Sequence, residues 1–598
     1  MQTILGHFAA NGARIALPSY REGNVVVSAA GTVALRGPIL YEHEGIALAL
    51  TGRPRLSDQA FDPSSIAAKL AALYRSKGPS FLTEIRGPFS VAIVDAESSS
   101  VLLAVDRMAV ESMCWTVGED GLLFGSLASQ VAAASARGAE INLQALYDFM
   151  FDHMVAGPDT AYVGVQKLLP ATALRFDDTG VRIDRYWHPD FTRSSDVRSL
   201  EKRLLPLLED AVGRTQPDDV TGCYLSGGLD SSTVTGVWAK LSSNRIKAFS
   251  VGFGVEGYDE LEYARIAARH FGCEHHEYVV TPRDIVETIP LIAKVYDEPF
   301  GNSSVVPAYC CARFAKEHGV VHLLAGDGGD ELFGGNERYV KQRVFELYNR
   351  VPPLLRRVVT EPLADHVDPE AAPLPFRKLS SYVRQARIPL PARYQTWNMI
   401  FREPAEKIFH PDLLASIDPQ RPLRRMREVW DACPSSDLLD RMLWFDWKFT
   451  LADNDLRKVS RTAELAGIRV SYPMLDEALI DFSLRIPSDE KIKGRELRAF
   501  YKRAMRGFLP ERILRKRKHG FGLPFGEWLK VDKALQDLVY GSLETLKARN
   551  IFAPSFLEAV VNEHRAGHPT YYGYAIWDLL MLEQWLQEAQ TFARVPGK

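Results

Sequence analysis

The alternation of apolar and polar positions divides the chain into two regions of different character. Up to about residue 188, short apolar runs separated by turns predict strands, and helical spacing predicts helices near 64–76 and 143–153. The expected strands are 46–50, 89–94, 101–105 and 122–124. Mixed strands and helices of this kind predict a layered α+β domain, which we assign to residues 1–190.

After a polar, turn-rich stretch at 188–196, strands and helices alternate along the chain. The expected strands are 220–225, 246–251, 276–280 and 320–324, and the expected helices are 231–241, 259–271, 283–296 and 304–318. This alternation predicts a parallel sheet with helices on both faces. From about residue 340 the pattern is almost all helical and ends in a strongly apolar stretch at 574–586. We assign residues 200–598 to this second domain.

Composition excludes several classes of partner. The chain has 598 residues, of which 46% are hydrophobic and 25% charged, as in ordinary globular proteins. Its formal net charge of -3 argues against nucleic acid or an acidic membrane as the main partner. No apolar run approaches the ~20 residues that cross a bilayer, and no signal peptide is evident, so the expected location is the cytoplasm. The six cysteines lack metal-site spacing and are expected to be buried free thiols.

The first expected strand of the second domain ends in a glycine turn that a helix follows directly. Backbone N–H groups and the positive end of the helix dipole would point at an anion there, and two glycines would let the backbone approach it. The expected anion-binding residues are Leu225, Ser226, Gly227, Gly228, Asp230, Ser231 and Ser232. Because no lysine follows the glycines, the turn is not a P-loop.

A second, acidic glycine-rich segment follows strand 320–324 and runs from Ala325 to Gly335, with Asp330 within it. In an open α/β sheet, ligands bind beyond the carboxyl ends of the strands, so Asp230 and Asp330 are expected at the same edge. Two carboxylates together with the phosphates of a nucleotide suit Mg²⁺, a hard cation that prefers oxygen ligands. The two turns together therefore predict a site for Mg²⁺ and the phosphates of a nucleotide.

These two turns, with the Asp297-Glu298-Pro-Phe segment and the basic stretch 512–528, resemble the synthetase domain of the asparagine synthetase B family from about 200 to 590. The segments 86–92, 104–107 and 121–126 resemble, more weakly, the glutaminase domain of that family. The resemblance implies an α+β N-terminal domain of the N-terminal-nucleophile (Ntn) hydrolase type. It also implies an α/β nucleotide α-hydrolase-like domain with a pyrophosphate loop and a largely helical C-terminal part.

The resemblance also implies a reaction. ATP and a substrate carboxylate would form an acyl-adenylate with release of pyrophosphate, and ammonia or an amine would then displace AMP. Asp327, at the place of a glutamate in asparagine synthetases, is implied as the base, and Arg498, at the place of a lysine, as the cation beside the leaving AMP. The other implied nucleotide contacts are Val251, Ala325, Gly326 and Lys516, and the implied substrate contacts are Asp297, Glu298 and Arg461.

The glutaminase half departs from the family pattern. That domain uses a cysteine at position 2 whose own α-amino group helps to activate the thiol, whereas this chain has Gln2 and no cysteine before Cys114. The family's glutamine-binding Asn-Gly-Glu also corresponds here to Thr51-Gly52-Arg53. We therefore expect no glutaminase nucleophile and no glutaminase activity, with nitrogen coming from free ammonia or an amine. A separate protein as the ammonia source and a homodimeric assembly both stay open.

The leading hypothesis is an ATP-dependent, AMP-forming amide ligase. It would make asparagine from aspartate, or an amide on a dedicated metabolite or peptide, as lasso-peptide cyclases and β-lactam synthetases do. A hypothesis from another class is a non-catalytic nucleotide-binding protein. The carboxylates of Asp230, Asp327 and Asp330 argue against it, because a protein that only binds a nucleotide has no need of three carboxylates around the phosphates.

Overall fold

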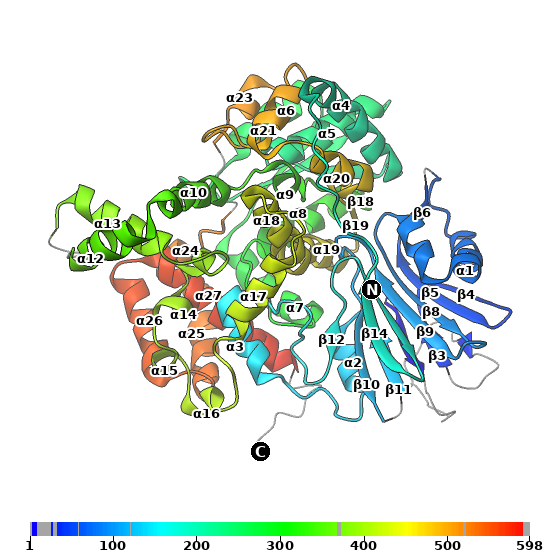
Figure 1. The fold of residues 1–598 in the computed structure, drawn as a ribbon, viewed down its shortest axis with the longest axis horizontal. Coiled ribbons are helices and arrows are strands. Elements are labelled where there is room, and N and C mark those ends of the chain that lie inside the picture. Colours follow the sequence, from blue (N-terminus) through cyan, green and yellow to red (C-terminus); the bar gives the residue numbers. More distant parts are fainter. Residues whose placement is uncertain are drawn as a thin grey trace.

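The computed structural model shows two domains packed side by side, with the amino-terminal one on the right of the view in Figure 1. The structure describes residues 3–8, 26–27, 33–57, 59–119, 121–367, 372–517 and 522–589. Gln2, the residue at the expected nucleophile position, lies outside the described residues.

Two six-stranded antiparallel sheets form the N-terminal domain in the described part of the chain. The first has the order β12-β10-β11-β1-β3-β2, with bounds Gln166–Lys167, Cys114–Gly118, Gly121–Gly125, Leu5–Phe8, Val33–Arg36 and Val26–Val27. The second has the order β14-β13-β9-β8-β5-β4, with bounds Gly180–Arg185, Thr172–Asp177, Ser100–Val105, Phe89–Asp95, Ile46–Gly52 and Ile39–His43. A small pair joins β6 (Arg55–Leu56) to β7 (Ile85–Arg86).

The alternation of side chains along β5 explains how these layers stack. Ile46 and Leu48 pack toward α1 (Ile66–Lys77), whereas Ala47 and Ala49 face the core between the two sheets. On the other sheet, α2 (Ala128–Ala134) contacts β10 and β11. The result is a helix–sheet–sheet–helix arrangement, which confirms the predicted layered α+β domain.

A five-stranded parallel sheet organises the second domain, with the order β17-β16-β15-β18-β19. The strands are Glu274–Val279, Lys247–Gly252, Thr221–Tyr224, His322–Leu324 and Arg469–Ser471. The nearby helices are α4 (Val197–Arg214), α5 (Leu229–Leu241), α6 (Leu261–Phe271), α7 (Pro282–Val295), α8 (Val305–Glu317) and α19 (Leu456–Leu465). Helices α5 and α6 cover one face, and α8 and α19 the other. The expected strands and helices between 220 and 324 are confirmed, but the fifth strand, β19, was not predicted.

The rest of the chain is mainly helical, as predicted. Its first elements are α9 (Gly329–Phe333), α10 (Glu337–Glu346), η2 (Leu347–Arg350), α11 (Pro353–Leu355), η3 (Arg356–Thr360), α12 (Glu361–His366) and α13 (Leu374–Ala386). Then follow η4 (Ala392–Gln395), α14 (Met399–Arg402), α15 (Ala405–Ile408), α16 (Pro411–Leu414), α17 (Arg421–Asp431), α18 (Leu438–Phe445) and η5 (Asp446–Asp455). After α19 come η6 (Pro473–Leu475), α20 (Glu477–Leu484), α21 (Ser488–Lys491), α22 (Ala499–Ala504), α23 (Glu511–Leu514), α24 (Phe525–Val531), α25 (Lys533–Lys547), α26 (Pro554–Ala566) and α27 (Pro569–Ala589).

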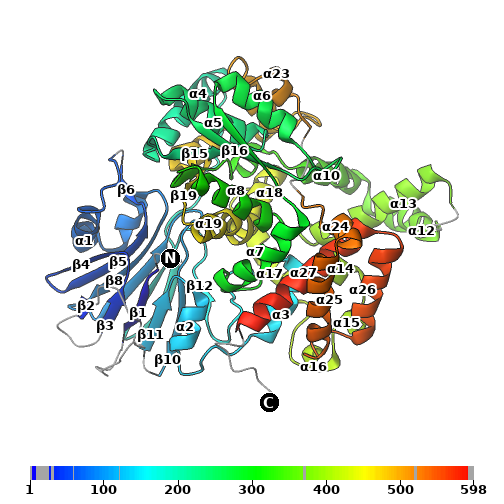
Figure 2. The same ribbon diagram turned by 180° about the vertical axis from the view of Figure 1, so that it is seen from behind.

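Two details of this helical part bear on the site. Helix α22 begins only at Ala499, because Arg498 precedes it in a left-handed conformation with φ of 55°. The π-helix η5 links α18 to α19 without a break, and its wider turn sets the positions of Asn454 and Asp455, which line the cavity described below. Helix α3 (Leu143–Asp152) packs against α14, α17 and α27. Figure 2 shows this contact from behind.

Helices α12 and α13 form an arm that projects away from the body of the protein (Figures 1 and 2). Five of the six cysteines are buried free thiols as expected, whereas Cys433 is partly exposed. Among the described residues, no helix combines the length and apolarity that a membrane span requires.

Candidate active site

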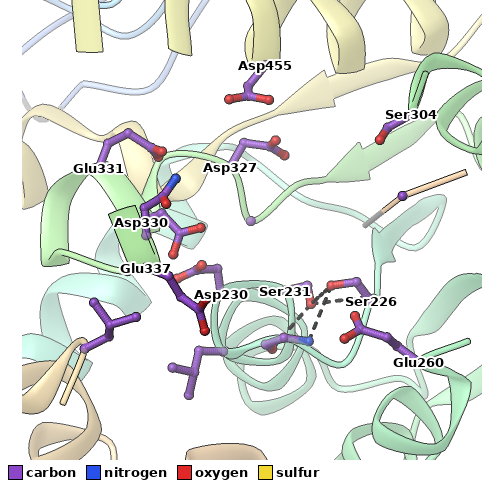
Figure 3. Close-up of a pocket in the computed structure, with 18 of the residues that line it drawn as sticks. Ser226, Asp230, Ser231, Glu260, Ser304, Asp327, Asp330, Glu331, Glu337 and Asp455 are labelled. Atoms are coloured by element: carbon purple, nitrogen blue, oxygen red, sulfur yellow. Dashed lines mark hydrogen bonds between the residues drawn. The ribbon is translucent and has the colours of Figure 1, made fainter. Parts of the chain in front are cut away.

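The predicted anion-binding turns open into a cavity of about 1370 Å³ at the carboxyl ends of β15, β16 and β18. Its wall also receives side chains from α10, from η5 and from the residues just before α22. Figure 3 shows the carboxylates and hydroxyls that gather around this space. Segments far apart in the sequence therefore meet in one site.

The turn after β15 is held closed by its own side chains. The hydroxyl oxygens of Ser226 and Ser231 lie 2.9 Å apart, and the backbone N–H of Ser226 donates to Ser231. A β-carbon at Gly227, where φ is 71°, would collide with the backbone of Ala264 in α6, so only glycine fits. Of the predicted anion-binding residues, the wall includes Leu225, Ser226, Gly228, Asp230 and Ser231. Ser232 is fully buried instead.

Asp230 and Asp330 are brought together as predicted, and Arg498 lies between them. Its guanidinium donates to Asp230 Oδ2 over 2.6 Å and also to Asp330, and its side chain is only 3% exposed. A β-carbon at Gly335 would collide with the Asp330 carboxylate, and one at Gly329 with the Asp230 carboxylate. The glycines of the acidic turn therefore make room for this cluster of charges.

This arrangement fits a divalent cation bound together with phosphates. Within the described residues, no three side chains of His, Cys, Asp or Glu gather closely enough to hold a metal ion by themselves. Asp230 and Asp330 nevertheless share a cationic partner, the Arg498 guanidinium, which stands where a cation between two carboxylates would stand. Mg²⁺ keeps waters and phosphate oxygens among its ligands, so two carboxylates suffice for the protein's share.

Asp327 lies on the wall near Asp455 and Lys458 (Figure 3). Burial raises the pKa of the Asp327 carboxyl to about 6, with Lys458 opposing the shift and Asp455 adding to it. Burial, with Asp455 and Asp446 nearby, likewise raises the pKa of Glu331 to about 8. A carboxylate of this kind can accept a proton near neutral pH.

Lys516, Val251 and Gly326 line the cavity, as the resemblance implied. The ammonium of Lys516 donates to the carbonyl of Gly227 over 3.3 Å and pairs with Glu260 at 3.1 Å, which holds a positive charge beside the turn after β15. Ala325 lies behind the wall, where its N–H donates to Ser471 of β19. It supports the site without lining it.

Asp297 and Glu298 do not line the cavity, in contrast to the implied substrate contacts. Both are buried and pair with Arg457, at 3.1 and 3.0 Å. Glu298 also accepts from Lys167 of β12 over 3.1 Å, and Asp297 accepts from the N–H of Ala128 at the start of α2. These contacts join the two domains, because carboxylates of the second domain accept hydrogen bonds from donors of the N-terminal domain.

Arg461 also lies away from the wall, where it pairs with Glu464 of its own helix at 2.9 Å. The sequence interpretation missed three wall residues of η5 and α19, namely Asn454, Asp455 and Lys458. The positions of these residues depend on the wider turn of the π-helix, and a search for α-helical periodicity in the sequence does not detect such a turn. Tyr224 also lines the cavity and was not among the predicted site residues. Its buried hydroxyl has no hydrogen-bond partner in the described structure.

The residues at the expected glutamine-binding position are already paired within the chain. The hydroxyl of Thr51 lies 2.7 Å from that of Ser90 and donates to Glu111 over 3.1 Å. The guanidinium of Arg53 donates to Gln216, a residue beyond the linker, and stacks on the ring of Phe61 at 4.5 Å. These contacts tie this part of the domain to its surroundings.

Fold and site together define a two-domain protein with an amidotransferase-type layered domain and a nucleotide-binding synthetase domain. The profile of the asparagine synthase family matches residues 203–587, and the chain belongs to this family. The profile of the glutamine amidotransferase domain matches residues 26–187. The chain is therefore a carbon–nitrogen ligase of a family that forms amide bonds with ATP, typically with Mg²⁺.

Curated relatives carry related names. The chain is 27% identical to asparagine synthetase [glutamine-hydrolyzing] 1 of Bacillus subtilis over 475 residues, covering 79% of this chain and 73% of the relative. It is 25% identical to a putative asparagine synthetase [glutamine-hydrolyzing] of Mycobacterium tuberculosis over 533 residues, covering 86% and 78%. Asparagine synthetase B of Escherichia coli is 27% identical over 322 residues, covering 51% and 52%.

Proposed function

We propose that this protein activates a substrate carboxylate with ATP, releases pyrophosphate and joins the acyl group to ammonia or an amine, with AMP as the final leaving group. The observation that carries the proposal is the meeting of Asp230, Asp330 and Arg498 beside the turn after β15. Unlike Arg457 with Asp297 and Glu298, this cluster lines the cavity, so its charges face the space that the phosphates would occupy.

Each residue of the cluster has a physical task in this reaction. The N–H groups and hydroxyls of the turn at Ser226 and Ser231 hold the departing pyrophosphate, and Lys516 adds a positive charge. Asp230 and Asp330 would hold Mg²⁺, whose charge, when bound, offsets that of the phosphates. Arg498 is buried next to the same group, and its fork of donors stabilises negative charge on the leaving phosphate oxygens.

The rate of amide formation is expected to fall as the pH drops through about 6. Asp327 would take a proton from the attacking amine, which requires its ionised form, and burial raises its pKa to about 6. An ordinary aspartate would stay ionised down to about 4. A pH–rate profile of the wild type and of Asp327→Asn checks this, since the variant should be slow at every pH. A wild-type profile that stays flat down to pH of about 4.5 would exclude Asp327 as the base.

We further propose that the N-terminal domain has no glutaminase activity. Gln2 stands in place of the nucleophilic cysteine, and Thr51 and Arg53 are engaged with Glu111 and Gln216 of the chain itself. Ammonia or an amine would then enter the cavity from solvent or from a separate protein.

The carboxylate substrate is either aspartate or a larger molecule, and the cavity favours the larger one. Beyond the nucleotide turns, its wall continues along α10 and α13 to Phe345 and Tyr382, whose rings stack 5.4 Å apart. Aspartate bound beside ATP would not reach this far part of the wall. Amide formation on a metabolite or peptide, as in natural-product cyclases, is therefore the second candidate function.

The first test is to measure pyrophosphate and asparagine made by the purified protein with ATP, Mg²⁺ and aspartate. Ammonium and glutamine are supplied in separate tubes. Asparagine with ammonium only supports an ammonia-dependent synthetase, whereas asparagine with glutamine as the nitrogen source contradicts the absence of glutaminase activity. Absence of pyrophosphate in both tubes, while Mg–ATP still binds, supports a carboxylate other than aspartate.

A further inference from the structure

The projecting arm turns apolar side chains toward solvent (Figures 1 and 2). Helix α11 and the π-helix η3 lead into α12 without a break, and along this run Leu354 is 76% exposed and Leu363 62%. Helices of globular proteins normally turn such side chains toward the core, and exposed apolar patches mark interaction surfaces. Nearly half of the exposed large apolar side chains of the described residues lie in 347–379, namely Leu347, Leu354, Leu355, Val358, Val359, Leu363, Leu374, Phe376 and Leu379.

The packing inside the arm does not use these exposed side chains. Ala364 of α12 is buried in the same cluster as Val383 and Ala386 of α13. The hydroxyl of Ser380 donates to the carbonyl of Ala364 over 2.7 Å, which ties the two helices together. The arm is therefore held by its inner face, and truncation of an outer apolar side chain should leave its fold intact.

One part of this apolar surface leads into the cavity. Phe376, Leu379 and Tyr382 follow one another along α13 at a spacing of three residues, so their side chains form a continuous ridge. Phe376 is 57% exposed and Leu379 54%, whereas Tyr382 lines the cavity. The hydroxyl of Tyr382 donates to the carbonyl of Val344 in α10 over 2.8 Å, and its ring stacks on that of Phe345. The ridge thus connects the arm with the cavity wall.

The charge that accompanies this surface is positive and open to solvent. The two acidic side chains among the described residues of the arm, Glu361 and Asp365, both pair with Arg387, at 4.0 and 2.8 Å. Lys341, one helical turn before Phe345, is exposed at the cavity wall. Four further cations on or beside the arm are exposed and form no ion pair with any described residue, namely Arg350, Arg357, Arg377 and Lys378.

Unpaired cations beside apolar side chains are complementary to an acidic amphipathic peptide, whose apolar side chains cover the ridge while its carboxylates face the cations. Two arms of the same charge would repel one another, which argues against an arm-to-arm contact between two copies of the chain. A membrane surface cannot follow the ridge from Phe376 to Tyr382 into the cavity, whereas a peptide can.

We propose that the arm binds an acidic amphipathic segment of a peptide substrate, whose reacting carboxylate enters the cavity past Phe345 and Tyr382. This inference rests on the proposed ligase function and names its substrate class, a peptide with acidic and apolar side chains. Binding at the arm holds the peptide close to the site, so the effective concentration of its carboxylate at the nucleotide rises.

The test uses two fluorescently labelled helical peptides of about 15 residues, with leucine at every third or fourth position and either glutamate or lysine elsewhere. Fluorescence anisotropy measures their binding to the full-length protein. The glutamate peptide should bind at least about tenfold more tightly than the lysine peptide, and added salt should weaken it. The double variants Phe376→Ala, Leu379→Ala and Arg377→Glu, Lys378→Glu should each weaken binding by about tenfold or more. Two controls on other exposed surfaces, Val531→Ala and Lys202→Glu, should leave it unchanged.

Titration of Mg–ATP separates this proposal from the ligase function, because the arm variants should bind Mg–ATP as the wild type does. A protein that binds Mg–ATP but does not prefer the glutamate peptide, or whose arm variants bind that peptide unchanged, would overturn the proposal. Vesicles containing phosphatidylserine, and sedimentation of the protein alone, test the other occupants. Vesicle binding or dimer formation that the arm variants abolish, without peptide binding, would also overturn it. A wild-type protein that binds the glutamate peptide but no Mg–ATP would contradict the ligase function alone.

Discussion

Replacement of Asp230 by alanine is expected to abolish pyrophosphate release, with a fall in rate of about 10³-fold or more. The substitution removes one of the two carboxylates that would hold the metal ion and leaves Arg498 paired with Asp330 alone. The guanidinium can then swing toward Asp330, so both the charge and the geometry of the site change. Release of pyrophosphate from ATP, followed with the carboxylate substrate that the first test identifies, measures this effect.

Two controls belong to that experiment. Gln2→Ala should leave the rate unchanged, because the residue has no part in the proposed reaction. Thermal unfolding of Asp230→Ala should stay close to that of the wild type, because the Asp230 side chain is partly exposed and lies at the cavity wall. A greater loss of activity in Gln2→Ala than in Asp230→Ala would contradict the assignment of the site.

Replacement of Arg457 by methionine is expected to have the largest effect on stability, about 3–5 kcal/mol. The change removes the arginine that pairs with the buried Asp297 and Glu298 and leaves Lys167 paired with Glu298, while it preserves much of the side-chain volume. Removal of one partner from a buried ion network costs more than the network contributes, because the remaining charges stay out of water. Denaturant unfolding followed by tryptophan fluorescence, with calorimetry to resolve separate domain transitions, measures the loss.

The matched control is Arg283→Met, which removes an exposed arginine paired with the exposed Glu287 at 2.6 Å. A solvent-exposed pair contributes at most about 1 kcal/mol, so this variant should unfold almost as the wild type does. The double variant Arg457→Met, Glu298→Gln should recover part of the lost stability, because it removes one of the unpaired charges. Equal stability of Arg457→Met and Arg283→Met would refute the role of the network in joining the domains.

The layered and the parallel sheets were predictable because their strands are short apolar runs with clear turns between them. The strand β19 escaped prediction for a physical reason. Arg469–Ser471 is three residues long and only half-buried, so it has no apolar run. It becomes a strand because β18 offers an unpaired edge, and the register His322 to Arg469 spans residues far apart in the sequence.

The candidate site was predictable where function depends on local geometry, and less so where it depends on distant contacts. The two glycine turns predict that Asp230 and Asp330 lie close together, because the strands before them are parallel and end at the same edge of the sheet. The contact of Arg498 with both carboxylates depends on a left-handed residue before α22, which the sequence pattern does not reveal. Asp297 and Glu298 are acidic in either role, and only the contacts of Lys167 with Glu298 and of Ala128 with Asp297 show that they join the domains.

The position of His153 gives the N-terminal domain a task that requires no glutamine chemistry. Helix α3 belongs to that domain, yet the residue after it forms part of the cavity wall in the second domain. A fragment beginning at residue 200 would lack this wall, and water would reach the activated acyl group from that side. Such a fragment would act as an ATP-consuming hydrolase, because an unshielded acyl-adenylate reacts with water before an amine can arrive. The N-terminal domain would then serve as a shield against futile ATP turnover.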